Sequence, residues 1–394
     1  MNPESGVSRQ VREDTHWLAI IAAISSISVV GVAIGLGMPL LSVILESRGH
    51  TTTMIGLNTA VAGLASLAAA PLAAPLAARL GVAPSILAMI VLGAVSFTGF
   101  YAAPSFWMWF PLRVGLHVAL TILFILSEFW ITSSAPPSRR GFVLGIYATV
   151  LSLGFAGGPW LFSRIGSDGF LPFGVTCGLV ALAALPVIAA WRDSPPMHSE
   201  GPRPGFQRYI WLVPTATAAV LVFGAVETGG FALFPVYGER IGYSETDTAL
   251  LLTMIGLGNV ILQIPLGMLS DQIRDRRHLL LACATIGLIG TLLMPLAASN
   301  WHLLAGLLFL WGGVVAALYT VGLAHLGSQL TGAELAAANA AFVFCYGIGM
   351  VLGPQAIGIG MDIAGVNGFG WSLSLFFGAY ILLLAGRLAA RARG

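Results

Sequence analysis

The stretch Arg192-Asp-Ser-Pro-Pro-Met-His-Ser-Glu-Gly-Pro-Arg-Pro-Gly-Phe-Gln-Arg208 is the longest polar interruption in this sequence of 394 residues. Its four prolines and two glycines disfavour a helix, and it lies at the midpoint of the chain. Six long apolar runs precede it and six follow it. The sequence therefore predicts two domains, residues 1–191 and 209–394, joined by a linker over residues 192–208.

The apolar runs on both sides are long enough to cross a membrane as helices, because about 20 residues span a hydrocarbon core of about 30 Å. Only 9% of the residues are charged, whereas soluble domains average about 25%. We therefore expect an all-α membrane protein of twelve transmembrane helices. They are predicted near 17–45, 54–78, 83–103, 106–133, 141–163, 170–191, 210–237, 248–269, 279–298, 302–325, 334–361 and 369–389.

The basic residues predict how these helices are oriented. All 18 are Arg; 14 fall on the side of the N-terminus and the linker, three on the other side (Arg48, Arg164 and Arg240), and Arg113 within an apolar run. Because basic loops stay in the cytoplasm, both termini are expected to be cytoplasmic in a multi-pass protein of the cell inner membrane. A net charge of +2 distributed in this way gives no reason to expect nucleic acid as a partner.

The two halves of the chain share short sequence patterns. Gly154-Phe-Ala-Gly-Gly158-Pro159 recurs as Gly349-Met-Val-Leu-Gly353-Pro354, and Glu46-Ser-Arg-Gly49 has a weaker echo in Glu239-Arg-Ile-Gly242. The spacings, 195 and 193 residues, nearly agree. Such matching predicts an internal duplication of six helices, the pattern of carriers with a site between two repeats.

One loop of the second half points to a family. The segment Gly267-Met-Leu-Ser-Asp271-Gln-Ile-Arg274-Asp-Arg276-Arg277 resembles the loop signature Gly-x-x-x-Asp-Arg-x-Gly-Arg-Arg of the major facilitator superfamily, although Gln272 and Arg274 depart from it. The equivalent first-half loop keeps only Arg79 and Gly81. The resemblance implies two pseudo-symmetric six-helix bundles around a central cavity, with Gly267, Asp271 and Arg274 at an inner gate.

The fourth run suggests a narrower group. Arg113, Glu128, Gly141 and Tyr147 have spacings that resemble those of the YcaD-like bacterial permeases, whose substrates are mostly unassigned. A related branch imports copper through Met-x-x-x-Met and His-x-x-x-Met pairs, which the seventh and eighth runs lack. We therefore expect no metal site and no cofactor.

Charged side chains inside a membrane are costly and usually functional. Arg113 and His117 are four residues apart and share a helix face. This face either lines the cavity and responds to anions or protons, which makes His117 a second candidate for proton coupling, or is bonded to neighbouring helices. Glu227, in the middle of the seventh run, is our best candidate for proton coupling, because desolvation favours a protonated carboxyl. Its alternative is a hydrogen bond between helices. Glu128 lies near the inner rim, where an ion pair with Arg139 or Arg140 is the alternative to proton coupling.

Other residues complete the predicted site. Tyr147, Tyr319 and Tyr346 lie deep in their runs and either line a cavity for an amphipathic or aromatic solute or pack against neighbours. Gly158, Pro159, Gly353 and Pro354 allow close helix packing and bending, and their motif resembles one linked to proton-driven export in the superfamily.

Together, these features predict a secondary active transporter that moves a small organic solute by alternating access. We expect coupling to protons, export ahead of import, contact with membrane lipids and a monomeric state. A receptor or assembly scaffold that keeps the carrier fold is the alternative. The sequence has no nucleotide-binding loop, metal cluster or nucleophile triad, so an enzyme is disfavoured.

Overall fold

The computed structural model describes residues 17–136, 139–197, 206–330 and 332–393, and within these ranges the chain forms helices and no strand. Because lipid offers no hydrogen-bond partners, a chain that crosses a membrane must satisfy its backbone internally, as a helix does. The all-α prediction is confirmed. Residues 198–205 of the expected linker lie outside the described residues, so the domain boundaries stay a prediction.

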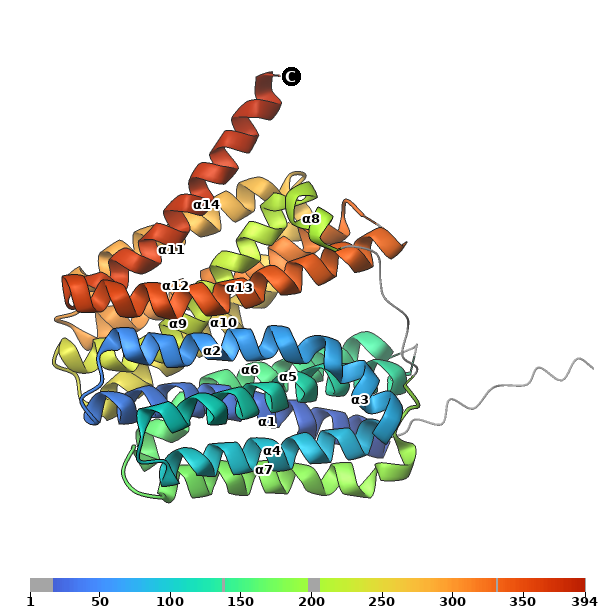
Figure 1. Cartoon of the computed structure of the whole chain (residues 1–394). Helices are drawn as coiled ribbons and strands as arrows, with labels where there is room; N and C mark the ends of the chain where they lie inside the picture. Colours follow the sequence, from blue (N-terminus) through green and yellow to red (C-terminus); the bar gives the residue numbers. More distant parts are fainter. Residues whose placement is uncertain (1–16, 137–138, 198–205, 331, 394) are drawn as a thin grey trace, which may run out of the picture.

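The first half of the chain forms one bundle, in the lower part of Figure 1. Its helices are α1 (Trp17–Ser47), α2 (Thr52–Ala69), η1 (Ala70–Leu72), α3 (Ala73–Leu80), α4 (Val82–Ala102), η2 (Phe106–Met108), α5 (Trp109–Ser134), α6 (Arg140–Ile165), α7 (Leu171–Ala189) and η4 (Trp191–Asp193).

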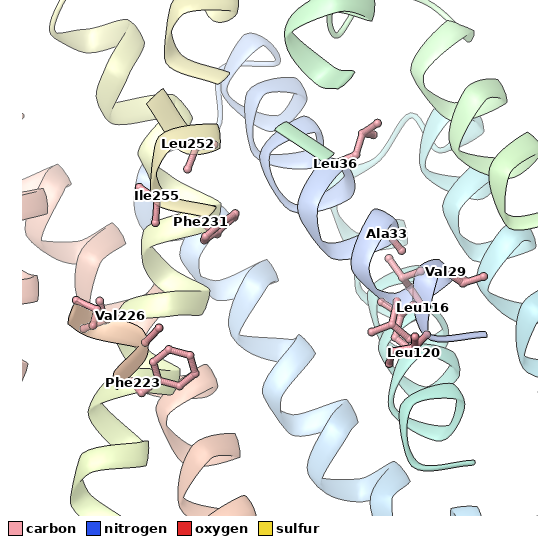
Figure 2. Packing of buried hydrophobic residues seen from close by; sticks show 14 of the residues in the cluster. Val29, Ala33, Leu36, Leu116, Leu120, Phe223, Val226, Phe231, Leu252 and Ile255 are labelled. Carbon is pink, nitrogen blue, oxygen red and sulfur yellow. The ribbon is translucent and has the colours of Figure 1, made fainter. Parts of the chain in front are cut away.

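The second half forms the upper bundle in Figure 1. Its helices are α8 (Gln207–Leu212), α9 (Pro214–Arg240), α10 (Glu245–Gln272), α11 (Arg276–Ala297), α12 (Trp301–Gly327), α13 (Gly332–Ala364) and α14 (Asn367–Arg393). Figure 2 shows buried side chains of both bundles: Leu116 and Leu120 meet Val29 and Ala33 of α1, while Phe231 of α9 lies near Leu252 and Ile255 of α10.

Twelve helical segments in the described residues are long and apolar enough to span a membrane, as predicted. Two expected runs are interrupted. The second changes from α2 to α3 through η1, which contains Pro71, and the seventh breaks between α8 and α9 at Pro214. Proline has no backbone N–H to continue a helix, which accounts for both breaks.

The bundles meet mainly where α2 packs on α13 and α6 packs on α10. We call the end of the molecule that holds residues 190–197 and 273–275 the linker end, and the end that holds residues 48–51, 166–170, 241–244 and 365–366 the distal end. In Figure 1 the linker end lies on the right and the distal end on the left. At the distal end the bundles are joined by hydrogen bonds of Asp362 with Thr52 and Thr53, a hydrogen bond between Ser167 and Glu245, and an ion pair between Arg240 and Glu46.

Candidate transport site and gating residues

Glu227 lies on the wall of a cavity where the two bundles meet. The cavity has a volume of about 30 Å³ and is bordered by Phe155 of α6 and by residues of the second bundle, including Phe231, Asn259 and Trp311. Glu227 is the one charged side chain among its described lining residues. A buried water needs roughly 10–15 Å³, so the cavity has room for about two waters beside the carboxyl group.

Glu227 also belongs to the most enclosed span, since 89% of the apolar window of α9 is buried. The Tyr346 hydroxyl donates a hydrogen bond to Glu227 Oε2 at 2.7 Å. The Tyr346 ring stacks on Phe223, with centroids 6.0 Å apart, and lies 6.4 Å from the Tyr319 ring. The structure thus brings together Glu227, Tyr346 and Tyr319, three of the residues singled out in the sequence.

Arg113 occupies a separate place inside the first bundle. Its side chain is 1% exposed, and its Nε and Nη2 donate to Asn58 Oδ1 of α2 at 3.0 and 2.9 Å. His117 follows on the same face, with Nδ1 3.1 Å from the Arg113 carbonyl oxygen. Among the described residues no carboxylate pairs with Arg113, and neither Arg113 nor His117 contacts Glu227.

Glu128 and Tyr147 lie closer to the second bundle. The Tyr147 hydroxyl and Ser127 Oγ are 2.9 Å apart and share a hydrogen bond. Glu128 is exposed and makes no ion pair with any side chain that the structure describes. It lies within electrostatic reach of Tyr147 and Tyr319, and Tyr319 is also within reach of Glu227. Tyr319 therefore lies within electrostatic reach of one carboxyl group from each bundle.

The two Gly-x-x-x-Gly-Pro segments hold equivalent helix pairs together. A Cβ added at Gly158 of α6 would overlap the backbone of Gly35 in α1, and one added at Gly353 of α13 would overlap Ala225 in α9. Pro159 and Pro354 follow within the same helices. The repeat in the sequence is thus a repeat in packing, with the backbones of α1 and α6, and of α9 and α13, in direct contact.

The loop that carries the signature lies between α10 and α11 at the linker end. Arg276 Nη2 is 3.3 Å from Asp271 Oδ1, and the Asp271 side chain is 77% exposed. Arg274 is exposed as well, and a Cβ at Gly267 would meet open space. In this conformation Asp271, near the end of α10, is bonded to Arg276, the first residue of α11.

Comparison with known proteins assigns the chain to a family. The model of the Major Facilitator Superfamily matches residues 22–257 and again residues 221–393. The chain belongs to the major facilitator superfamily. Among curated relatives, an uncharacterized MFS-type transporter, YfkF of Bacillus subtilis (strain 168), is 29% identical over 339 residues, covering 84% of this chain and 86% of that protein. A similarly described transporter of Yersinia enterocolitica, YE1530, is 24% identical over 270 residues, 67% of this chain and 68% of that one.

Solved structures of superfamily proteins share the fold. The nucleoside transporter NupG superposes with a TM-score of 0.75 at 13% identity, covering 94% of this chain and 98% of that one. A D-xylose–proton symporter superposes with a TM-score of 0.73 at 14% identity, covering 93% and 96%. The protein is therefore a superfamily transporter with twelve membrane spans and not an enzyme. The narrower YcaD-like resemblance stays a prediction.

Three polar residues with contacts in the structure were not predicted from the sequence as site residues. Asn58 binds Arg113, Asn259 borders the cavity of Glu227, and Asp362 bridges the bundles at the distal end. For Asn58 and Asn259 the available signal was an amide within an apolar run. Asp362 follows the recognised Gly353-Pro354 segment, but nothing in the sequence indicates its partner.

Proposed function

We propose that the protein is a proton-coupled secondary carrier that moves a small organic solute across the cell inner membrane by alternating access, with both termini cytoplasmic. We place export ahead of import, because both bundles carry the motif that resembles one linked to proton-driven export. The carrier acts as a monomer among membrane lipids.

The hydrogen-bonded Glu227 carboxyl on the cavity wall carries this proposal. A group that binds and releases a proton has to reach water in one state and be shielded in another, and a cavity with room for about two waters at the border of the bundles supplies that setting. The Tyr346 hydroxyl holds the carboxylate oxygen in place at 2.7 Å. Glu128 and His117 are secondary candidates for proton transfer.

The remaining site residues have supporting roles in the proposal. Tyr147, Tyr319 and Tyr346 line the solute path, and Arg113 sets the electrostatic potential of the first bundle. Gly158, Pro159, Gly353 and Pro354 let the inner helices of each bundle pack tightly and bend. Gly267, Asp271 and Arg274 form the gate at the linker end.

Glu227→Gln tests the coupling, because glutamine resembles the protonated carboxyl and cannot release a proton. A solute is first identified by its thermal stabilisation of the purified protein, since a ligand of the folded state raises apparent stability. We expect reconstituted Glu227→Gln to lose accumulation driven by a pH gradient, because a side chain that cannot bind and release a proton cannot couple transport to that gradient. Passive exchange of the solute should persist.

Glu239→Gln is the matched control, because Glu239 is an exposed acid on the same helix. It should accumulate solute like the wild type. If Glu227→Gln still concentrates solute with the wild-type pH dependence, Glu227 is structural and the proton role passes to His117 or Glu128. Solute binding without any solute-dependent proton flux in the wild type would instead favour a receptor or scaffold.

A further inference from the structure

At the distal end, the carboxylate of one bundle is bonded to the first turn of a helix of the other. Asp362, near the end of α13, accepts hydrogen bonds from the Thr52 backbone N–H at 3.1 Å, the Thr52 hydroxyl at 2.5 Å and the Thr53 backbone N–H at 2.9 Å. Thr52 and Thr53 begin α2. The carboxylate thus satisfies backbone donors that the helix leaves free and complements the positive end of its dipole.

The internal repeat places a second contact at the equivalent positions. The spacing of 195 residues that relates Gly154 to Gly349 also relates Ser167 to Asp362, and the spacing of 193 that relates Glu46 to Glu239 also relates Thr52 to Glu245. The Ser167 hydroxyl donates to Glu245 Oε2 at 2.6 Å. In both contacts the acid belongs to the second bundle and the donor to the first, so the acid lies near a helix end in one contact and at a helix start in the other. The second contact joins the end of α6 to the start of α10, the repeat equivalents of α13 and α2.

A third contact is weaker. Arg240 Nε lies 3.0 Å from Glu46 Oε1, with the two side chains 31% and 22% exposed. Ion pairs that water reaches are worth about 0–1 kcal/mol. A carboxylate bonded to backbone N–H groups makes charge-assisted hydrogen bonds that are roughly twice as strong as neutral ones, and its partners are held in place by the helix. Asp362 therefore contributes most to holding the distal ends together.

We propose that Asp362 is a positioning residue of the transport cycle. Its hydrogen bonds to the start of α2 keep the distal end closed, and these bonds must break before that end can open. Ser167 and Glu245 form the repeat-related counterpart of this contact. The place of the contact in a cycle rests on the alternating access proposed above, whereas its effect on the distal end does not depend on the solute or on protons.

The test measures distances between spin labels on the purified, reconstituted chain without solute. Labels on Ser105 and Ser299, exposed residues of the two bundles at the distal end, report on that end. Labels on Arg79 and His278, exposed in the two bundles at the linker end, report on the other. Each pair is introduced into a background in which Cys177, Cys283 and Cys345 are replaced by alanine.

In Asp362→Asn we expect the ratio of open to closed distal ends to rise roughly tenfold or more, because a hydrogen bond to a charged group is lost. Asp168→Asn, which neutralises an exposed acid at the same end, should leave the distribution at its wild-type value. Thr52→Val removes the hydroxyl that lies within hydrogen-bond distance of Asp362 Oδ1 and of the Gly358 carbonyl oxygen, both on α13, and keeps the two backbone donors to Asp362. It should give a smaller shift in the same direction. It also keeps the test usable if Asp362→Asn fails to fold.

Distal distances in Asp362→Asn and Thr52→Val that match those of the wild type would overturn the proposal. An equal shift in Asp168→Asn would overturn it too, because surface charge alone would then be the cause. If the distal end opens while the linker end closes, both the contact and alternating access are supported. If the distal end opens and the linker end stays unchanged, the role of Asp362 is supported and alternating access fails.

Discussion

The buried guanidinium of Arg113 depends on one side-chain oxygen. Its Nε and Nη2 both donate to Asn58 Oδ1, and its Nη1 has the Met38 sulfur at 4.0 Å as its one described hydrogen-bond partner. A buried charge that loses its hydrogen-bond partner retains the full cost of desolvation. Asn58→Ala should therefore destabilise the protein by about 2–3 kcal/mol, seen as a lower melting temperature of the purified protein.

The double variant Asn58→Leu with Arg113→Met is the control for this prediction. Replacing a buried charge and its partner by apolar residues of similar size is often neutral. The double variant should melt close to the wild type, and the prediction fails if it melts as low as Asn58→Ala. Retained transport in the double variant would make Arg113 structural, whereas lost transport at normal stability would support a direct role in transport.

At the scale of elements, α6 offers two neighbouring glycines with opposite surroundings. A Cβ at Gly158 would overlap the backbone of Gly35 and Leu36 in α1, whereas a Cβ at Gly157 would meet nothing within 4 Å. Gly158→Ala should separate α1 from α6 and destabilise the protein by about 1–3 kcal/mol, the usual cost of overpacking. Gly157→Ala should be neutral or stabilising by up to about 1 kcal/mol. Thermal unfolding of the two variants side by side checks this, and equal melting temperatures would contradict it.

The helices themselves were largely predictable from the sequence. The sixth run, expected at 170–191, is α7 (Leu171–Ala189), because a membrane span must be apolar along its whole length. The contacts between helices were not predictable to the same degree. Glu227 stands out as an acid in an apolar run, but its bond to Tyr346 joins residues 119 positions apart. Only the packing of α9 against α13 reveals such a partner.

At the scale of the whole molecule, substitutions of Asp271 at the linker end and of Asp362 at the distal end should shift the conformational equilibrium in opposite directions. Asp271 is bonded to Arg276 in the conformation described, and we expect it to engage the first bundle when the linker end closes. Because a carboxylate at a helix N-terminus is worth about 0.3–1 kcal/mol, Asp271→Asn should raise the population with an open linker end about two- to fivefold. The spin-label pair on Arg79 and His278 measures it. An unchanged distribution, or a shift toward closure, would argue against a gate at Asp271.

The direct backbone contact of α1 with α6 and of α9 with α13 has a consequence for the cell. Helices whose backbones touch at glycines cannot slide far past each other, so each bundle moves largely as one body against the other even where single helices bend. Two such bodies that rock about their shared border separate at one end only as they approach at the other. A continuous water path across the membrane therefore does not form, and we expect the transporter to conduct no leak current. The membrane voltage of a cell that makes many copies should remain unchanged until solute is present.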